Sequence, residues 1–77
     1  MFVRFKTSQH PKVNGVNEYL CSSIADIDKL PKYDIPGTQE GDAFHNVPCG
    51  FRSTAMVCDG ASTEVYILNP ENNWVKL

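Results

Sequence analysis

The sequence lacks a long hydrophobic run, a basic cluster and an even set of cysteines. A membrane helix needs about 20 consecutive apolar residues, so no membrane span is predicted. Seven Lys and Arg residues are interspersed with nine Asp and Glu residues for a net charge of −2, which disfavours a nucleic-acid partner. The three cysteines, Cys21, Cys49 and Cys58, fit reduced thiols better than a disulfide framework. Residues 1–6 are too few and too charged for a secretory signal, which predicts retention in a cytoplasm.

The residues that are present have the composition of a small folded protein. Of the 77 residues, 42% are hydrophobic and 21% are charged, which is not the composition of a disordered chain. This length predicts one domain, residues 1–77, with a thin core that buries roughly 60% of the surface of the extended chain. Chains this short often gain stability from metals, disulfides or oligomerisation.

The N-terminal segment, residues 2–6, alternates between apolar and basic side chains. Val3 and Phe5 point to one side of an extended chain, and Arg4 and Lys6 point to the other. This pattern predicts an N-terminal strand or arm, which we expect to be able to add to the sheet edge of a partner.

Residues 23–30 predict a short helix, and residues 32–47 predict a long loop. Ser23 is a good N-cap, and Pro31 ends the run. One apolar helix face is expected to consist of Ile24, Ile27 and Leu30. The acidic side chains of the first turns, Asp26 and Asp28, are two residues apart, do not face each other on a helix and are expected to be solvated.

The C-terminal third, residues 53–77, predicts a three-stranded antiparallel meander. Its strands are expected at residues 53–58, 64–69 and 74–77, where β-branched and aromatic residues gather. The sequences Asp59-Gly60 and Asn69-Pro70 are turn signals between them. The whole sequence therefore predicts an α+β, mostly β fold, with a small antiparallel sheet and one short helix.

The middle strand of this meander has apolar residues on both faces. Val65 and Ile67 lie on one face, and Tyr66 and Leu68 lie on the other. An antiparallel strand with one solvated face normally alternates more cleanly. One face is expected to meet the helix, and the other to meet either the N-terminal strand or another subunit.

Four segments of the C-terminal part carry a resemblance to known proteins: residues 46–50, 53–59, 65–69 and 71–77. In these segments the chain resembles small phage and prophage virion proteins, which tend to end in a Gly-Ser-Thr strand, an Asp turn, a Val-Tyr strand and an Asn-x-Trp strand. The likeness covers residues 46–77 and is typical of a hairpin, not of a catalytic site. This chain departs from the pattern at Phe51 and Arg52, which are inserted before the Ser-Thr pair.

The resemblance implies a virion structural role without enzymatic activity, as an accessory component of a phage head (decoration or head fibre) or of a connector or tail. The expected partners are other virion proteins and further copies of the chain, without nucleic acid, membrane or cofactor, and the expected location is the virion after synthesis in the host cytoplasm. The residues expected to contact partners are Tyr66, Leu68, Trp74, Phe2 and Phe5. Tyr66 and Trp74 suit either an intrachain aromatic pair or an interface anchor.

Two other functions compete with this interpretation. One is a small phage-encoded interaction or regulatory protein that is never packaged. The other is a metal protein or enzyme built on His45, Cys49 and Cys58. His45 and Cys49 form one loose ligand pair without a second pair for zinc, and a Cys-His nucleophile needs a third, orienting group. Cys58 is expected in the core, because free cysteine is often buried.

Overall fold

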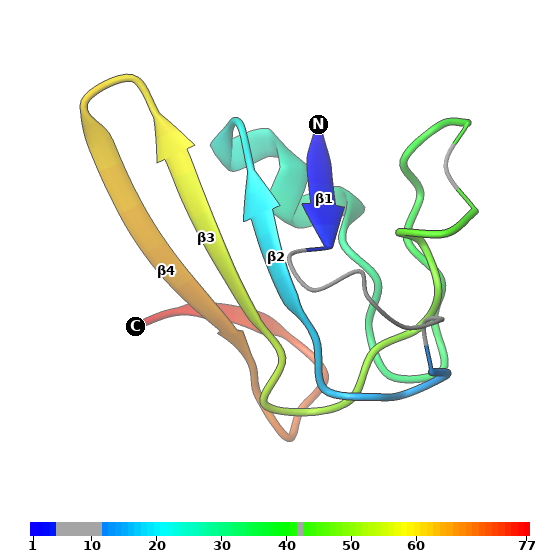
Figure 1. The fold of residues 1–77 in the computed structure, drawn as a ribbon. Coiled ribbons are helices and arrows are strands. Elements are labelled where there is room, and N and C mark those ends of the chain that lie inside the picture. The colour runs from blue at the N-terminus through cyan, green and yellow to red at the C-terminus, as the bar shows by residue number, and fades with distance from the viewer. Residues whose placement is uncertain (5–11, 42) are drawn as a thin grey trace.

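The computed structural model describes residues 1–4, 12–41 and 43–77. Within these residues, five strands form one sheet in the order β1-β2-β3-β4-β5, and one short helix lies against it (Figure 1). The elements are β1 (Phe2–Arg4), β2 (Glu18–Cys21), η1 (Ile24–Lys29), β3 (Thr54–Asp59), β4 (Ser62–Leu68) and β5 (Trp74–Lys76). The expectation of a small, mostly β fold with little helix is confirmed.

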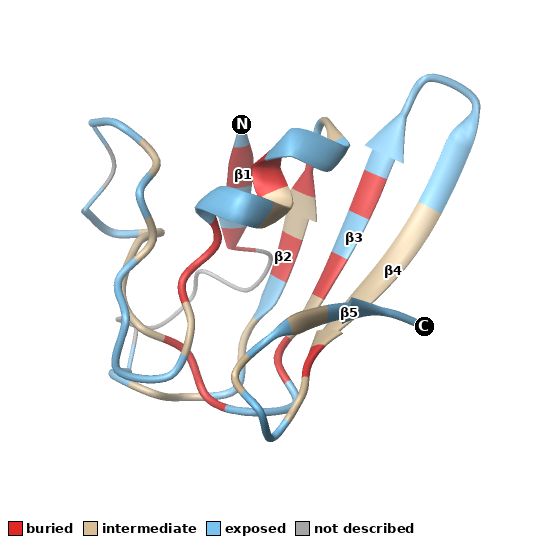
Figure 2. Cartoon of the chain, turned by 180° about the vertical axis from the view of Figure 1, so that it is seen from behind, coloured by how far each residue is buried: buried red, intermediate tan, exposed pale blue. Residues whose placement is uncertain are grey.

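The sheet is mixed, which corrects the expectation of an antiparallel sheet. β2 and β3 run parallel, with Tyr19 opposite Ala55, and the other neighbouring pairs are antiparallel. Parallel neighbours need a long crossover connection, and residues 22–53 provide it by passing over one face of the sheet. Seen from that face, β3 lies to the right of β2, so the crossover is right-handed, as nearly all such connections are (Figure 2).

The face of the sheet that meets this crossover, here called the inner face, carries the core. Side chains alternate along each strand, so the buried strand residues all point to this side. Figure 2 shows the alternation of buried and less buried positions along β2 and β3. Tyr19 lies at the centre, with its ring edge-to-face with Phe2 at 5.9 Å and with Trp74 at 6.1 Å. The core consists of Phe2, Tyr19, Cys21, Leu30, Cys49, Ala55, Val57 and Leu68.

The helix η1 is a 3₁₀ helix of six residues. The Leu30 N–H donates to the Ile27 carbonyl at 3.3 Å, an i→i+3 bond, and Pro31 follows at once. Leu30 is buried and Ile27 packs against the core, as the expected apolar face requires. Ile24 is 49% exposed, however, because its turn lies at the margin of the sheet.

Asp26 is buried, with 2% of its surface exposed, and is not solvated as expected. Its carboxylate accepts hydrogen bonds from the Met1 ammonium, with both oxygens at 2.6 Å, and from the Ser22 and Ser23 N–H groups at 3.1 and 3.3 Å. Burial by itself raises the pKa of Asp26, but these bonds and the ammonium charge outweigh burial and hold the pKa below its usual value. The ionised carboxylate therefore ties the chain start to η1.

Side chains of the long loop cover the outer edge of β1. The Gln39 amide accepts from the Phe2 N–H at 2.7 Å and donates to the Phe2 carbonyl at 2.9 Å. The His45 Nδ1 atom accepts from the Arg4 N–H at 2.8 Å. Covering an edge in this way prevents pairing with another strand. The described part of the expected arm is therefore β1, a strand of the chain's own sheet. One of its edges pairs with β2, and loop side chains occupy the other. Residues 5 and 6 lie outside the described residues.

Two tight turns set the register of β3, β4 and β5. Asp59 pairs with Ser62 across a two-residue loop that begins with Gly60 at φ +62°, a conformation that glycine adopts without strain. In the second turn the Asn69 side chain accepts from two backbone N–H groups, and Asn72 takes the left-handed conformation at φ +65°. Asn tolerates that region better than most residues, so the local sequence suits this turn.

Candidate functional site

The face of the sheet turned away from η1, here called the outer face, is apolar and is covered by no described element. Strand register places Val3, Leu20, Met56 and Val65 in one row across β1 to β4. Ile67 lies on the same face of β4, two residues from Val65. Figure 1 looks onto this side, with η1 and β5 behind the strands, whereas in Figure 2 both lie in front. Val3 and Met56 are 36% and 40% exposed, and the other three are half-buried.

The outer face is also almost free of charge. Among the described strand residues on this face, only Glu18 is an acidic or basic residue, and it lies at the start of β2. The other outward residues of these strands are Thr54, Cys58, Thr63 and Val75. A continuous apolar surface without charge is typical of a protein contact rather than of a solvated sheet face.

A hollow of about 370 Å³ indents one end of the outer face. Its lining residues are Met1, Val3, Leu20, Cys21, Ser22 and Cys58. Cys58 is exposed there, which corrects the expectation that it lies in the core, because Cys58 alternates with the buried Val57 and points outward. Cys21 and Cys49 are buried instead. Cys58 is therefore the accessible thiol of the three.

The structure places the expected partner residues on the inner face. Phe2 and Leu68 are 0% and 1% exposed, so both are core residues and not contact residues. Tyr66 and Trp74 are half-buried and pack against the same core. Phe5 lies outside the described residues. The expected contact surface is thus the covered side of the sheet, at each of the four positions that the structure describes.

The contacts of Trp74 and Tyr66 are intrachain. The Trp74 indole N–H donates to the Pro31 carbonyl at 3.0 Å, and its ring meets Tyr19 rather than Tyr66. The Tyr66 hydroxyl donates to the Glu64 carboxylate at 3.2 Å. Trp74 therefore fastens β5 to the chain just after η1, and Tyr66 packs at the margin of the core.

The signal for the outer face was present in the sequence. The middle strand showed two apolar sets, Val65 with Ile67 and Tyr66 with Leu68, and one of them had to face away from the helix. Aromatic residues are enriched at protein interfaces, which favoured the set with Tyr66. In this chain the large rings fill a thin core instead, and the smaller aliphatic set points outward.

His45 and Cys49 have separate partners. The Cys49 thiol donates to the Pro31 carbonyl at 3.4 Å, and burial raises its pKa, so it stays protonated at neutral pH. His45 accepts from the β1 backbone. Among the described residues, no group of three His, Cys, Asp or Glu side chains is arranged to hold a metal ion.

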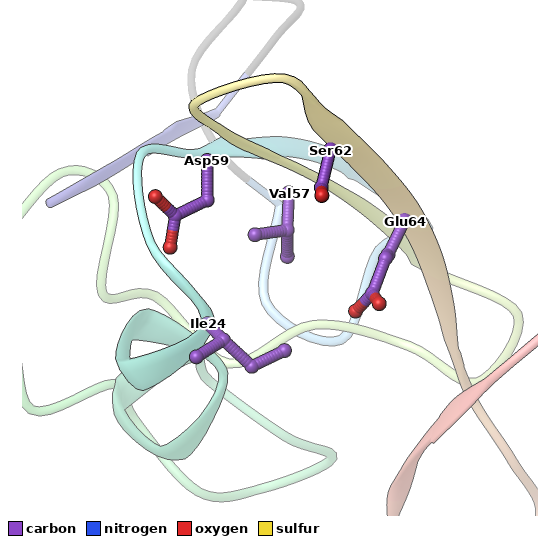
Figure 3. A pocket seen from close by; sticks show the side chains of 5 residues that line it. All are labelled: Ile24, Val57, Asp59, Ser62 and Glu64. Atoms are coloured by element: carbon purple, nitrogen blue, oxygen red, sulfur yellow. The ribbon is translucent and has the colours of Figure 1, made fainter.

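A second hollow, of about 260 Å³, lies on the inner side between η1 and the β3–β4 hairpin (Figure 3). Ile24 and Val57 supply its apolar wall, and Asp59, Ser62 and Glu64 supply its polar wall. Lys76 Nζ lies 3.0 Å from the Glu64 carboxylate. The hydrogen bond and charge of Lys76 lower the pKa of Glu64, so this carboxylate is ionised at neutral pH and is a poor proton donor.

The loops at one end of the molecule meet through a surface aromatic stack. The rings of Tyr33 and Phe51 are parallel within 4° at a centroid distance of 4.8 Å. Asn72 exchanges two hydrogen bonds with the Tyr33 backbone, at 2.9 and 3.2 Å. Phe51 and Tyr33 therefore hold two loops against each other.

The chain matches no protein-family model, no curated protein and no solved structure. In the part of the chain that the structure describes, no helix is long and apolar enough to cross a membrane.

Proposed function

We propose that this chain is a structural component of a phage virion that acts by protein–protein assembly, without catalysis, and that its outer face is the contact surface. The observation that carries the proposal is the uncovered, nearly uncharged row Val3, Leu20, Met56 and Val65. The phage assignment itself comes from the resemblance of residues 46–77 to virion proteins. The proposed role is that of an accessory component of the head or of the connector or tail, located in the virion.

The C-terminal meander supplies most of this contact surface. Three of its outward residues, Met56, Val65 and Ile67, lie on β3 and β4, and Val75 extends the surface on β5. The residues of the resemblance and of the proposed surface therefore overlap. In this arrangement the meander supplies most of the contact surface, and Val3 and Leu20 of β1 and β2 extend it.

The size of the outer face favours attachment in many copies. Four strands spaced about 4.8 Å apart, with about five residues each at 3.3 Å, give a face of roughly 320 Å². A standard stable interface buries about 800 Å² on each partner. A single contact of this size is weak, but repetition on a symmetric particle multiplies it into lasting attachment.

Mass spectrometry of purified virions from the host that produces the chain tests this function. We expect the chain to be present in the particles at high copy number. Met56→Lys places a charge in the centre of the outer face and is expected to remove the chain from particles, whereas Ile24→Lys, at a similarly exposed site on the opposite side of the sheet, is expected to leave incorporation unchanged. A wild-type chain that is expressed but not found in particles would falsify the virion role and favour an unpackaged interaction protein.

A further inference from the structure

The charge distribution of the outer face allows it to pack against the same face of a second copy. Glu18 is its one charged strand residue and lies in a corner, one strand and two residues away from Met56. Strand spacings place these two positions about 8 Å apart. A twofold axis that stacks two outer faces lies between the sheets and parallel to them, so the sheet spacing alone keeps the two Glu18 backbone positions at least about 10 Å apart. That separation exceeds the Debye length of about 8 Å at physiological salt, so the like charges repel little.

The shape of the face leads to the same partner. β1 to β4 form a twisted sheet with an apolar side, and η1 and the long loop already cover the other side. Two such sheets pack face to face at about 10 Å, with strands within about 30° of one another, as in a β-sandwich. The described part of each copy therefore resembles one half of a sandwich without its second sheet.

The outer face also lacks the features that select a different protein. Specific recognition of a foreign surface usually depends on placed charges and hydrogen-bonding groups that fix its orientation. The central residues Leu20, Met56 and Val65 are all aliphatic, and the polar Thr54 and Thr63 lie toward the ends of the strands. Identical apolar faces can pack about a twofold axis without such groups, and twofold contacts between copies are the commonest interfaces of homo-oligomers.

We propose that two copies of the chain stack their outer faces on each other about a twofold axis near Met56. This inference rests on the proposed function in one respect, since it names the partner of the same contact surface. The stacked area is roughly 320 Å² on each copy, less than half of a standard interface. The dimer is therefore weak, with a dissociation constant of about 10 μM to 1 mM, and it becomes permanent when many copies are held close together.

Cys58 provides a built-in probe of this contact. It lies on the outer face two residues from Met56, about 7 Å along the strand. Cys21 and Cys49 are buried, and burial raises the pKa of Cys21 to about 11, so neither competes for a thiol reagent in the folded protein. The reaction of Cys58 therefore reports how far the outer face is covered.

Sedimentation equilibrium of the full chain between about 5 μM and 1 mM tests the proposal. We expect a monomer–dimer equilibrium in the wild type, and a dissociation constant at least about tenfold higher for Met56→Lys and Val3→Lys. Ile24→Lys is the matched control and is expected to dimerise as the wild type does. Circular dichroism confirms that each variant is folded, and both outer-face positions are exposed enough to accept lysine.

The second readout is the rate at which a thiol reagent modifies Cys58. The rate is expected to fall several-fold as the wild-type concentration rises, and to stay constant for Met56→Lys. A wild type that remains monomeric at 1 mM overturns the stacking, as does a dimer that Met56→Lys and Val3→Lys leave intact. A monomeric chain that is abundant in virions overturns the stacking alone, and a stacked dimer that is absent from virions overturns the virion role alone.

Discussion

The inner and outer faces of the sheet come from the same strands but differ in charge, size of side chain and cover. The inner face carries the aromatic residues Phe2, Tyr19 and Trp74, and charged side chains such as Glu64 and Lys76 at its margin. The outer face carries aliphatic side chains and is covered by no described element. Within the described residues, η1 and the segments around it cover one side of the five-stranded sheet, and the other side is the contact surface that we propose.

A matched pair of substitutions in β4 tests this difference most strongly. Leu68 is 1% exposed on the inner face, and its neighbour Ile67 is half-buried on the outer face. Leu68→Ala is expected to lower the free energy of unfolding by about 3 kcal/mol, because it leaves a cavity in a packed core. Ile67→Ala is expected to cost about 1 kcal/mol or less in the monomer, since its site already meets solvent.

Urea unfolding at low protein concentration, where the chain is monomeric, measures both changes. Ile67→Ala is expected to weaken association at high concentration, whereas Leu68→Ala acts on folding alone. Equal destabilisation by the two variants at low concentration would contradict the distinction between the faces, because it would mean that Ile67 is also part of a closed core.

The sequence could predict the strand-rich character of the fold, but not which face of the sheet is covered. β-branched and aromatic runs indicate strands directly. Val65 with Ile67 and Tyr66 with Leu68 are equally apolar pairs. The face of the sheet that becomes buried is the one over which the connection from β2 to β3, with η1, passes. That crossing follows from the parallel pairing of β2 and β3, a contact between distant segments that no local pattern encodes.

Contacts between distant segments also explain why the predicted positions of individual residues were wrong. Asp26 has the local signature of a solvated helix start, but its burial depends on the Met1 ammonium, 25 residues earlier in the sequence. Cys58 points outward because Ala55 and Val57 of β3 are buried and side chains alternate along a strand. A single cysteine does not indicate by itself which face of the strand it occupies. Gln39 reads as an ordinary loop residue, although its amide covers the β1 edge. In each case the function of the side chain is set by a partner that is distant in sequence.

The second prediction concerns Asp26, which holds the start of β1 against η1. Asp26→Asn removes the charge from a buried network of hydrogen bonds and is expected to cost about 2 kcal/mol at neutral pH. The pKa of Asp26 in the folded chain lies below its ordinary value of 3.8. This contribution is therefore complete above about pH 5 and is lost as the pH falls through the folded pKa.

Thermal unfolding between pH 7 and pH 2 follows this contribution. The difference between the wild type and Asp26→Asn is expected to shrink at the acid end. Asp28→Asn, an exposed position on the same helix, is the control and is expected to show a small difference at every pH. A difference between wild type and Asp26→Asn that does not change down to pH 2 would show that the ionised form is not what stabilises the fold.

The smallest expected effect is at the edge of the sheet, where the two faces meet. Gln39→Ala removes the amide that accepts from the Phe2 N–H and donates to its carbonyl, at an expected cost of about 1 kcal/mol. Glu40→Ala, at the exposed neighbouring position, is the control. Hydrogen exchange of the Phe2 amide is the sensitive measurement, because the bond to Gln39 protects that proton and global stability changes little. We expect faster exchange of the Phe2 amide in Gln39→Ala and not in Glu40→Ala. An uncovered β1 edge can pair with another strand, so we also expect Gln39→Ala to associate even when it carries Met56→Lys. Equal exchange rates of the Phe2 amide in the two alanine variants would mean that Gln39 does not protect the β1 edge. Within the described residues, the outer face would then not be the one surface through which two copies can associate.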